Sequence, residues 1–397
     1  MILDILGWCI AIVPALLLAV LIVELALGVV SRGDTRQRSG GSRHSAAILM
    51  PAHNEAGGIA RTVGDLLPKL DDTIRLIVIA DNCSDDTARI ARAAGATVIE
   101  RHDPSQRGKG HALAFGREWL LADSTVPPPD CVVVLDADCE IGADDLRLLI
   151  DIACATQRPV QSCYLLRWAP DDSAMTQISN FAMLIKNRVR QRGASALGVP
   201  AILGGTGMAF PWDLIAQAPL ATSHLVEDLV LGIHFTRQGT PPRYLEAATT
   251  WSDPASQQDT LTQRTRWEHG YIHTALRHGA PLLVEGLAKL RPGLVWFGLS
   301  LLVPPLALLM SLGLLALTLT ALLALLGASA APMLLLVACL VLTALLLVLA
   351  WARDGRETVT AGTLARIPLY IAWKIPVYLR LARKRETEWV RTRRKGE

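Results

Sequence analysis

The sequence Cys131-Val-Val-Val-Leu-Asp-Ala-Asp138 decides the fold of this chain. It begins with a short apolar run that contains three β-branched valines and that follows Pro127-Pro-Pro129. A continuous apolar run of this length is typical of a strand that is buried on both faces of a parallel sheet. Asp136 and Asp138 then come at the carboxyl end of the strand, where open α/β sheets bind their ligands.

Two aspartates one residue apart suit a hard divalent cation that bridges protein and phosphate oxygens. The alternative is a polar turn that closes the strand, because an isolated D-x-D pattern is common by chance. The surrounding sequence must therefore decide between these two interpretations.

Short apolar segments and helical patterns alternate on both sides of this stretch. The predicted strands are 46–50, 74–80, 97–100, 131–135 and 160–166. The predicted helices between and after them are 56–70, 84–94, 109–121, 144–156, 173–192, 226–238 and 259–277. Such alternation, with strands rich in Val and Ile, predicts an α/β fold with a doubly wound, mostly parallel sheet.

The composition places part of the chain in a membrane. The 397 residues are 51% hydrophobic, with a mean hydropathy of +0.34 and a net charge of +3, and the apolar excess lies at the two ends. This length allows one large domain or two modest ones.

The seven cysteines form no C-x-x-C pattern, which favours reduced, core-packed thiols in a reducing compartment over disulfides or a zinc site.

The first apolar segment, residues 5–30, contains a single charged residue, Glu24, and is long enough to cross a bilayer. A cleaved signal peptide is the alternative, but no Lys or Arg precedes Arg32. Arg32, Arg36, Arg38 and Arg43 follow the segment. By the positive-inside rule we therefore expect an uncleaved anchor, followed by a cytoplasmic domain.

The C-terminal third predicts a transmembrane hairpin. Residues 294–326 carry no charge, and a short turn separates them from a second uncharged run, 333–351. The tail is rich in Arg and Lys, and its segment 367–381 has aromatic residues among the bases, as in a helix at the membrane interface. We thus expect an anchor (1–31), an α/β domain (44–280), an interfacial segment with a hairpin (281–352) and a basic cytoplasmic tail (353–397), in a multi-pass protein of the inner membrane.

Polar side chains follow the predicted strands at the edge where Asp136 and Asp138 also lie. The first strand leads into Pro51-Ala-His-Asn-Glu55, and the second into Asp81-Asn-Cys-Ser-Asp-Asp-Thr87. Ser84 is expected to cap the next helix, whereas Asp81 is placed to bond a ribose or a base. Lys109 opens a helix whose free N–H groups suit a diphosphate, although the spacing of a P-loop is absent.

Two later motifs also carry chemistry. Glu227 and Asp228 lie among apolar residues, so that one carboxylate either caps a helix or has the raised pKa of a general base. On a predicted helix, Arg266 can bind phosphate oxygens and Trp267 can stack on a sugar, and the alternative is an amphipathic helix that docks near a membrane.

Together these motifs resemble the processive branch of family 2 glycosyltransferases, the GT-A enzymes that include bacterial cellulose, hyaluronan and poly-N-acetylglucosamine synthases. Pro51 to Glu55 is similar to the first-strand P-x-x-N-E, and Asp81 to Thr87 to the D-x-x-S-x-D-T nucleotide loop. Lys109-Gly resembles the lysine-glycine of that branch, and Asp136-Ala-Asp138 resembles its D-x-D.

The second half of the motif set follows in the same order. Gly205-Thr206-Gly207 is similar to the acceptor-side loop, and Glu227-Asp228 to the E-D whose aspartate is the base. Gln263 to Trp267 resembles Q-x-x-R-W. The chain differs from the secreting members in having few membrane spans and a tail too short for a cyclic-di-GMP domain.

The resemblance implies an inverting glycosyltransferase that uses a nucleotide-diphosphate sugar, UDP-linked, and that adds the sugar to a growing exopolysaccharide or cell-surface glycan. Asp138 would bind Mg²⁺ or Mn²⁺, and Asp228 would be the catalytic base. The residues implied for the donor are Pro51, Glu55, Asp81, Lys109, Asp136, Gln263 and Arg266. Those implied for the acceptor are Gly205, Thr206, Gly207, Glu227 and Trp267.

The expected partners are the nucleotide sugar, a glycan or lipid-linked acceptor, membrane lipids and polysaccharide export proteins, with no nucleic acid. Two other functions are compatible with the sequence. One is a single transfer to a lipid acceptor, such as ceramide or a polyprenyl carrier, because ceramide glucosyltransferases carry a related R-W motif. The other is a non-catalytic membrane scaffold, which the complete acidic set disfavours.

Overall fold

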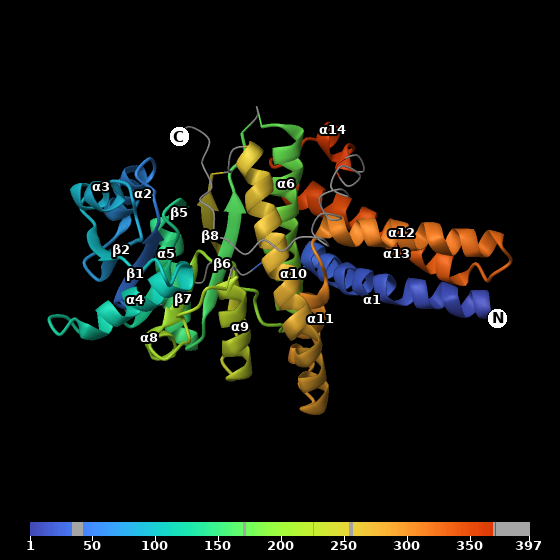
Figure 1. Cartoon of the computed structure of the whole chain (residues 1–397), viewed down its shortest axis with the longest axis horizontal. Helices are drawn as coiled ribbons and strands as arrows, with labels where there is room; N and C mark the ends of the chain where they lie inside the picture. The colour runs from blue at the N-terminus through green and yellow to red at the C-terminus, as the bar shows by residue number, and fades with distance from the viewer. Residues whose placement is uncertain (34–42, 170–171, 225, 254–256, 368–369, 371–397) are drawn as a thin grey trace. The chain divides into compact units, whose positions relative to one another are not determined.

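The computed structural model describes residues 1–33, 43–169, 172–224, 226–253, 257–367 and 370, without the side chains of 257–267. These residues form two compact units (Figure 1). The sheet unit comprises Arg32–Arg167 and Pro200–Gly270. The helical unit comprises Met1–Ser31, Trp168–Val199 and the described chain from Tyr271 onward.

The sheet unit contains one eight-stranded sheet. Its strands are β1 (Ala46–Ala52), β2 (Ile74–Asp81), β3 (Thr97–Arg101), β4 (Cys131–Val134), β5 (Cys139–Ile141), β6 (Val160–Leu166), β7 (Met208–Pro211) and β8 (Arg243–Ser252). Their order across the sheet is β3-β2-β1-β4-β7-β6-β8-β5. Four of the strand pairs are parallel and three, which involve β7 and β5, are antiparallel. The predicted α/β fold with a mostly parallel sheet is therefore confirmed.

Helices cover the sheet because the strands are apolar on both faces. These helices are α2 (Ile59–Leu66), η1 (Leu67–Lys69), α3 (Thr87–Ala93), α4 (Lys109–Ala122), α5 (Ala143–Thr156), α8 (Trp212–Ile215) and α9 (Glu227–Arg237). All four residues of β4 are buried, as the sequence of this strand predicts. One core cluster joins Leu49 of β1, Leu113 of α4 and Phe210 of β7, whose ring centroid lies 5.8 Å from that of Phe235 in α9.

Two details of the sheet unit differ from the sequence-based expectations. The five predicted strands are present, but β5, β7 and β8 were not expected. Ser84 does not cap a helix, since α3 begins only at Thr87. Instead, the backbone N–H of Ser84 donates to Asn54 Oδ1 at 2.7 Å, and this bond connects the loops that follow β1 and β2.

The helical unit contains the apolar segments. Its helices are α1 (Ile2–Val30), α6 (Ala174–Leu184), η2 (Ile185–Arg190), α7 (Gln191–Ala196), α11 (Pro292–Leu302), α12 (Leu306–Leu325), α13 (Ala331–Ala350), η3 (Trp351–Gly355) and α14 (Ala361–Leu364). The long helix α10 (Gln257–Ala288) begins in the sheet unit and ends in the helical unit. Within the described chain, three helices are long and apolar enough to cross a membrane: Ile2–Val30, Leu306–Leu325 and Ala331–Gly355.

The predicted uncharged run 294–326 is not one helix. It is divided into α11 and α12 at Pro304-Pro305, because proline cannot donate a backbone hydrogen bond and disfavours a helical residue before it. The first helix of the expected transmembrane hairpin is therefore α12 alone, and α11 is a separate, shorter apolar helix.

Charged residues connect α1 to the rest of the helical unit. Glu24 is fully buried and accepts from Arg190 Nε at 2.7 Å. Arg192 donates to both carboxylate oxygens of Asp354, at 2.9 and 3.0 Å, and to the carbonyl oxygen of Gly28 at 2.8 Å. The backbones of α1 and α7 touch here, since a Cβ atom on Gly193 would lie 1.9 Å from the carbonyl oxygen of Glu24.

Candidate active site

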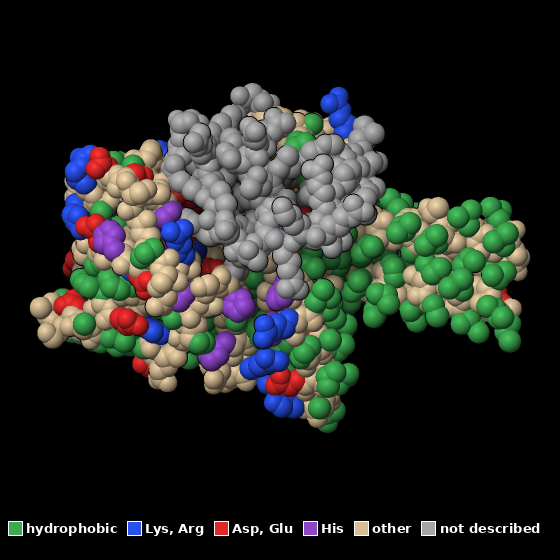
Figure 2. Space-filling model, viewed as in Figure 1, with side chains coloured by type: hydrophobic (Ala, Val, Ile, Leu, Met, Phe, Trp, Pro, Cys, Tyr) green, Lys and Arg blue, Asp and Glu red, His purple; other side chains and the backbone are tan. Residues whose placement is uncertain are grey.

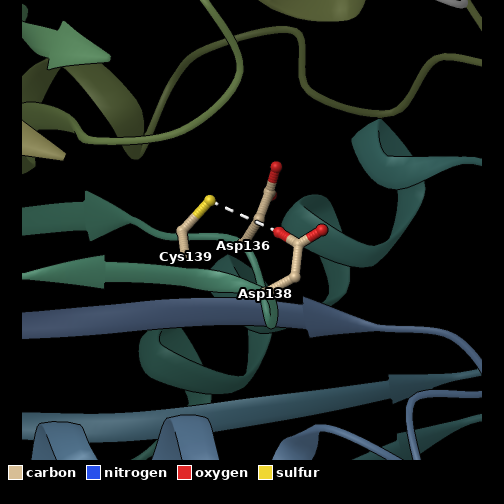
Figure 3. A group of neighbouring side chains, drawn as sticks. All are labelled: Asp136, Asp138 and Cys139. Carbon is tan, nitrogen blue, oxygen red and sulfur yellow. Dashed lines mark hydrogen bonds between the residues drawn. The ribbon is translucent and has the colours of Figure 1, made fainter. Parts of the chain in front are cut away.

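The two aspartates of the opening motif lie just beyond β4, where the apolar run ends. The backbone N–H of Leu135 still bonds to β1, whereas that of Asp136 turns to Thr206 Oγ1 at 3.0 Å. Figure 3 shows Asp136, Asp138 and Cys139 close together. Ligand atoms of these three side chains lie within 4.8 Å of one another, and they are the metal-competent group found among the described residues.

The donor chemistry of this group fits a hard divalent cation. Cys139 is buried and donates from Sγ to Asp138 Oδ1 at 3.3 Å (Figure 3). Burial, reinforced by the Asp136 carboxylate, raises the pKa of the Cys139 thiol far above its ordinary value. Hard cations prefer oxygen ligands over sulfur, so the carboxylate oxygens of Asp136 and Asp138 suit Mg²⁺ or Mn²⁺.

Lys109, the first residue of α4, connects the aspartates to the Gly205–Gly207 loop. Its Nζ donates to Asp136 Oδ1 and, at 2.7 Å, to the carbonyl oxygen of Gly205. Burial lowers the pKa of Lys109, but the carboxylates of Asp136 and Glu227 outweigh burial and raise the pKa above its ordinary value. The side chain is thus a permanent cation in the middle of the acidic cluster.

The loop that contains Gly205 and Gly207 depends on glycine. Both residues have a positive φ, +87° and +62°. Gln161 of β6 holds the loop by accepting from the backbone N–H of Gly204 at 2.7 Å and by donating to the carbonyl oxygen of Thr206 at 3.0 Å. A Cβ atom on Gly207 would lie 2.1 Å from Ser162 Oγ, so that no side chain fits at this position.

We expect Gly207→Ala to lower the free energy of unfolding of the protein by at least about 1–3 kcal/mol, because overpacking and a positive φ act together. Gly204→Ala is the matched control, since a Cβ atom there would lie 3.7 Å from Gln161 Oε1 in ordinary contact. Thermal unfolding of both variants measures the difference. Equal melting temperatures for the two variants would contradict this reading of the loop.

Glu227 and Asp228 lie at the N-terminus of α9, where carboxylates interact favourably with the helix dipole. Asp228 Oδ1 accepts from the backbone N–H of Leu229 at 2.8 Å. Asp228 Oδ2 faces the glycine loop, since a Cβ atom on Gly205 would lie 3.4 Å from this oxygen and 3.6 Å from Lys109 Nζ. Burial, and then the charge of Asp228, raises the pKa of Glu227 to about 8.

The raised pKa of Glu227 predicts a pH-dependent stability. The folded protein holds this proton more tightly than the unfolded chain, so the stabilisation is complete below the ordinary pKa of about 4.5 and is lost as the pH rises through about 8. Glu227→Gln, which cannot ionise, should therefore gain melting temperature relative to wild type between pH 5 and pH 8.5. Melting curves of both metal-free proteins test this, and a constant difference across the range would refute it.

The motifs after β1 and β2 meet at the same edge. Asp81 is the last residue of β2, and its Oδ1 accepts from Arg101 at 2.7 Å and from Asn82 Nδ2 at 3.1 Å. Pro51 lies in β1, and the backbone N–H of Glu55 donates to Thr87 Oγ1 at 2.7 Å. These contacts order the two loops beside each other.

The structure thus brings most of the predicted site residues into two neighbouring parts of the sheet unit. Gln263, Arg266 and Trp267 lie on α10, and their side chains are outside the described ones. Gln161, Arg101 and Cys139 were not predicted. Gln161 lies in the predicted strand 160–166, and Arg101 directly follows the predicted strand 97–100. Neither has a motif around it, so no local sequence signal distinguishes them from other strand residues.

Comparisons with known proteins agree with this geometry. Residues 44–270 match the family model described as "Glycosyltransferase like family 2". A segment of 108 residues is 32% identical to the low-salt glycan biosynthesis hexosyltransferase Agl6 of Haloferax volcanii, and covers 27% of this chain and 24% of that protein. A segment of 67 residues is 34% identical to Protein RfbJ of Shigella flexneri, and covers 17% of this chain and 49% of that protein. The chain thus matches less than half the length of either relative.

Among solved structures, the mannosyltransferase PcManGT from Pyrobaculum calidifontis, in complex with GDP-Man and Mn²⁺, aligns with a TM-score of 0.58. The alignment covers 89% of this chain and 98% of that chain at 16% identity. This likeness concerns the fold, and it extends beyond the sheet unit because it includes most of the chain.

Proposed function

Because this chain belongs to glycosyltransferase family 2, we propose that it transfers a hexose from a nucleotide-diphosphate sugar to a glycan at the cytoplasmic face of a membrane, with inversion at the anomeric carbon. The observation that supports this most strongly is the position of Lys109. Its Nζ contacts Asp136, on the proposed donor side, and the Gly205 carbonyl, on the proposed acceptor side. Asp228 Oδ2 lies beside the same glycine.

In this mechanism, Asp228 takes the proton of the acceptor hydroxyl while the hydroxyl oxygen forms its bond to the anomeric carbon. The bond between that carbon and the diphosphate oxygen breaks, and the nucleoside diphosphate leaves. Asp136 and Asp138 would hold Mg²⁺ or Mn²⁺, which offsets the charge that develops on the departing diphosphate. Lys109 supplies a further fixed positive charge near this position.

The arrangement around Asp81 supports a uridine donor. Arg101 and Asn82 both donate to Oδ1, and among the described residues no hydrogen bond is made to Oδ2, which leaves one carboxylate oxygen for a ligand. Uracil offers a single ring N–H, whereas the corresponding edge of guanine offers two adjacent donors that need both oxygens of a carboxylate. The buried Arg101 would keep Oδ1 engaged and thereby favour UDP over GDP.

Calorimetric titration of the purified protein with UDP and with GDP, each with Mn²⁺, tests the donor. We expect UDP to bind more tightly, and Arg101→Lys, which keeps the charge with fewer donors, to reduce the UDP/GDP affinity ratio. Tighter binding of GDP to the wild-type protein would overturn the uridine assignment without affecting the assignment as a glycosyltransferase.

The acceptor is either a growing glycan or a lipid. The three candidate spans favour a transfer at the membrane surface and are compatible with both acceptors. Incorporation of a radiolabelled sugar, followed by separation into lipid-extractable and polymeric products, distinguishes a polymerising enzyme from one that acts once on a lipid. If no nucleotide sugar gave radiolabel in either fraction, the protein would not be a transferase, and the non-catalytic scaffold would be the remaining function.

The arginines after α1 support a cytoplasmic active site, since Arg32 and Arg43 flank the entry to the sheet unit. With three spans, the two termini lie on opposite sides of the membrane. Single cysteines at Met1 and Gly396, in a background without native cysteines, should then react with an impermeant reagent from opposite sides. Labelling of both from the periplasmic side would refute this topology.

A further inference from the structure

One connecting segment of the sheet unit leads to the proposed base. It consists of residues 216–224, which follow α8 and precede α9, the helix that begins with the acidic pair. The segment packs along α4, the helix that begins with Lys109. Ala218 and Leu220 of the segment belong to the same buried core cluster as Leu113 of α4. The helix that provides the donor-side cation therefore also supports the chain that leads to the acidic pair.

Gly110, the second residue of α4, allows the connecting segment to approach the helix closely. A Cβ atom at this position would lie 2.5 Å from the carbonyl oxygen of Leu220 and 2.8 Å from that of Thr222. Both oxygens belong to the backbone, so a side chain here would fit only if the segment moved by roughly 1 Å to an ordinary contact distance. The glycine that follows Lys109 is thus needed for the position of the segment.

Two side chains of α4 bond to the connecting segment. Arg117 donates from Nη1 to the carbonyl oxygen of Ala218 at 2.6 Å. Nearer the N-terminus of the helix, a hydrogen bond of 3.1 Å joins His111 Nε2 and Ser223 Oγ. The two anchors are six residues apart in α4 and five residues apart in the segment, so together they hold most of its length against the helix.

The anchor at His111 lies at the surface of the sheet unit. His111 is half-buried and Ser223 is exposed. Figure 2 shows histidine side chains (purple) at the surface of the region where Figure 1 labels α4, α8 and α9. Removal of this hydrogen bond therefore leaves the hydrophobic core intact and acts on the segment itself, five residues before Asp228.

We propose that His111 and Arg117 are positioning residues, which hold the connecting segment on α4 and thereby set the place of Asp228 relative to Lys109. This inference rests on the proposed function, since it gives both residues a part in the transfer. Asp228 Oδ2 lies beside Gly205, whose carbonyl oxygen accepts from Lys109. A displacement of about 1 Å in a reacting group can lower the rate about 100-fold. Donor binding depends on α4 and the strand ends, and it is not expected to change with the segment.

Variants that remove each anchor test this proposal in the full-length protein in nanodiscs. His111→Ala and Arg117→Met should each lower the turnover number about three- to tenfold, which is the value of one hydrogen bond. The affinity for UDP with Mn²⁺, measured by calorimetry, should stay at the wild-type value. His111→Gln and Arg117→Lys keep a side-chain nitrogen that can reach the segment, and both should recover most of the turnover.

His44→Ala is the matched control. His44 precedes β1 and therefore lies at the opposite end of the strands from Asp136, and its ion-pair distance to Asp130 is 4.0 Å. This variant should keep wild-type turnover. A parallel loss of turnover and UDP affinity in His111→Ala would overturn the proposal, because α4 itself would then be disturbed. Turnover by His111→Gln no higher than that by His111→Ala would also overturn it, because the hydrogen bond would then be irrelevant.

Hydrogen–deuterium exchange of the metal-free proteins gives a readout that does not require transfer. Peptides from residues 216–230 should exchange faster in His111→Ala than in wild type, and peptides from α5 should exchange at the wild-type rate. Equal exchange of 216–230 in the two proteins would contradict the anchoring role. An absence of transfer by wild type would instead refute the proposed function, and faster exchange in His111→Ala would still show that the anchor holds the segment.

Discussion

Replacing Asp228 with Asn should lower turnover by at least about 100-fold, because a positioned general base contributes about 10²–10⁴-fold in rate. The amide has nearly the same shape and can still accept from the backbone N–H of Leu229, so the N-terminus of α9 should remain intact. The amide cannot take a proton from the acceptor hydroxyl. Turnover of a radiolabelled donor and calorimetric donor affinity should be measured on the same nanodisc preparation.

Two comparisons make this result specific to the base. Donor affinity of Asp228→Asn should stay close to that of wild type, since Asp228 faces the glycine loop rather than Asp81. Glu227→Gln should reduce turnover less, because Glu227, with a pKa of about 8, is largely protonated at neutral pH and serves to position its neighbour. Wild-type turnover by Asp228→Asn would remove this residue from the chemistry.

The second large effect concerns the metal. In wild type, Mn²⁺ should increase the affinity for UDP, and Asp138→Asn should remove most of this increase. The loss should exceed roughly 10–100-fold, which is the cost of losing a residue that only supports a metal ligand. The change removes a charge from an oxygen ligand and leaves the fold unchanged, because Asp138 lies between β4 and β5 rather than in the core. Calorimetry with and without Mn²⁺ measures the difference directly.

Cys139→Ser is the matched control for this variant. Serine keeps a donor toward Asp138 Oδ1, and the thiol is not expected to bind the metal, because a hard divalent cation prefers oxygen ligands. Metal-dependent binding should therefore survive in Cys139→Ser. If this variant lost it as completely as Asp138→Asn, the sulfur would have to be counted among the ligands.

The fold could be predicted from the sequence wherever a strand is buried on both faces. β4 is a continuous apolar run, and β2 is apolar from Leu76 to Ala80, and the bounds of both strands were predicted to within one residue. β8 was missed because Glu246 and several small residues interrupt its pattern, and β5 because it has only three residues. The break at Pro304-Pro305 was visible as a motif, but its effect on the span was not predicted, since prolines also occur within transmembrane helices, as Pro14 does in α1.

The residues of the candidate site also divide into those that the sequence predicted and those that it did not. Asp136, Asp138 and Asp228 were found because motifs at strand and helix ends carry them. Gln161 and Arg101 were not, because each acts through a residue that is distant in sequence: Gln161 through Gly204 and Thr206, and Arg101 through Asp81. A single sequence does not reveal such pairs, since their spacing is set by the order of strands in the sheet.

The residues 168–199 belong to the helical unit, although the chain on both sides of them belongs to the sheet unit. A water-soluble enzyme therefore cannot be obtained by removing the terminal apolar segments alone. Without α1 and the span formed by α13 and η3, Arg190 would lose Glu24, and Arg192 would lose Asp354 and the Gly28 carbonyl. The segment 168–199 would then keep two arginines without these partners, and it would lose the apolar helices against which it packs. Excision would have to remove the inserted segment 168–199 as well, and bridge β6 directly to the chain at Pro200.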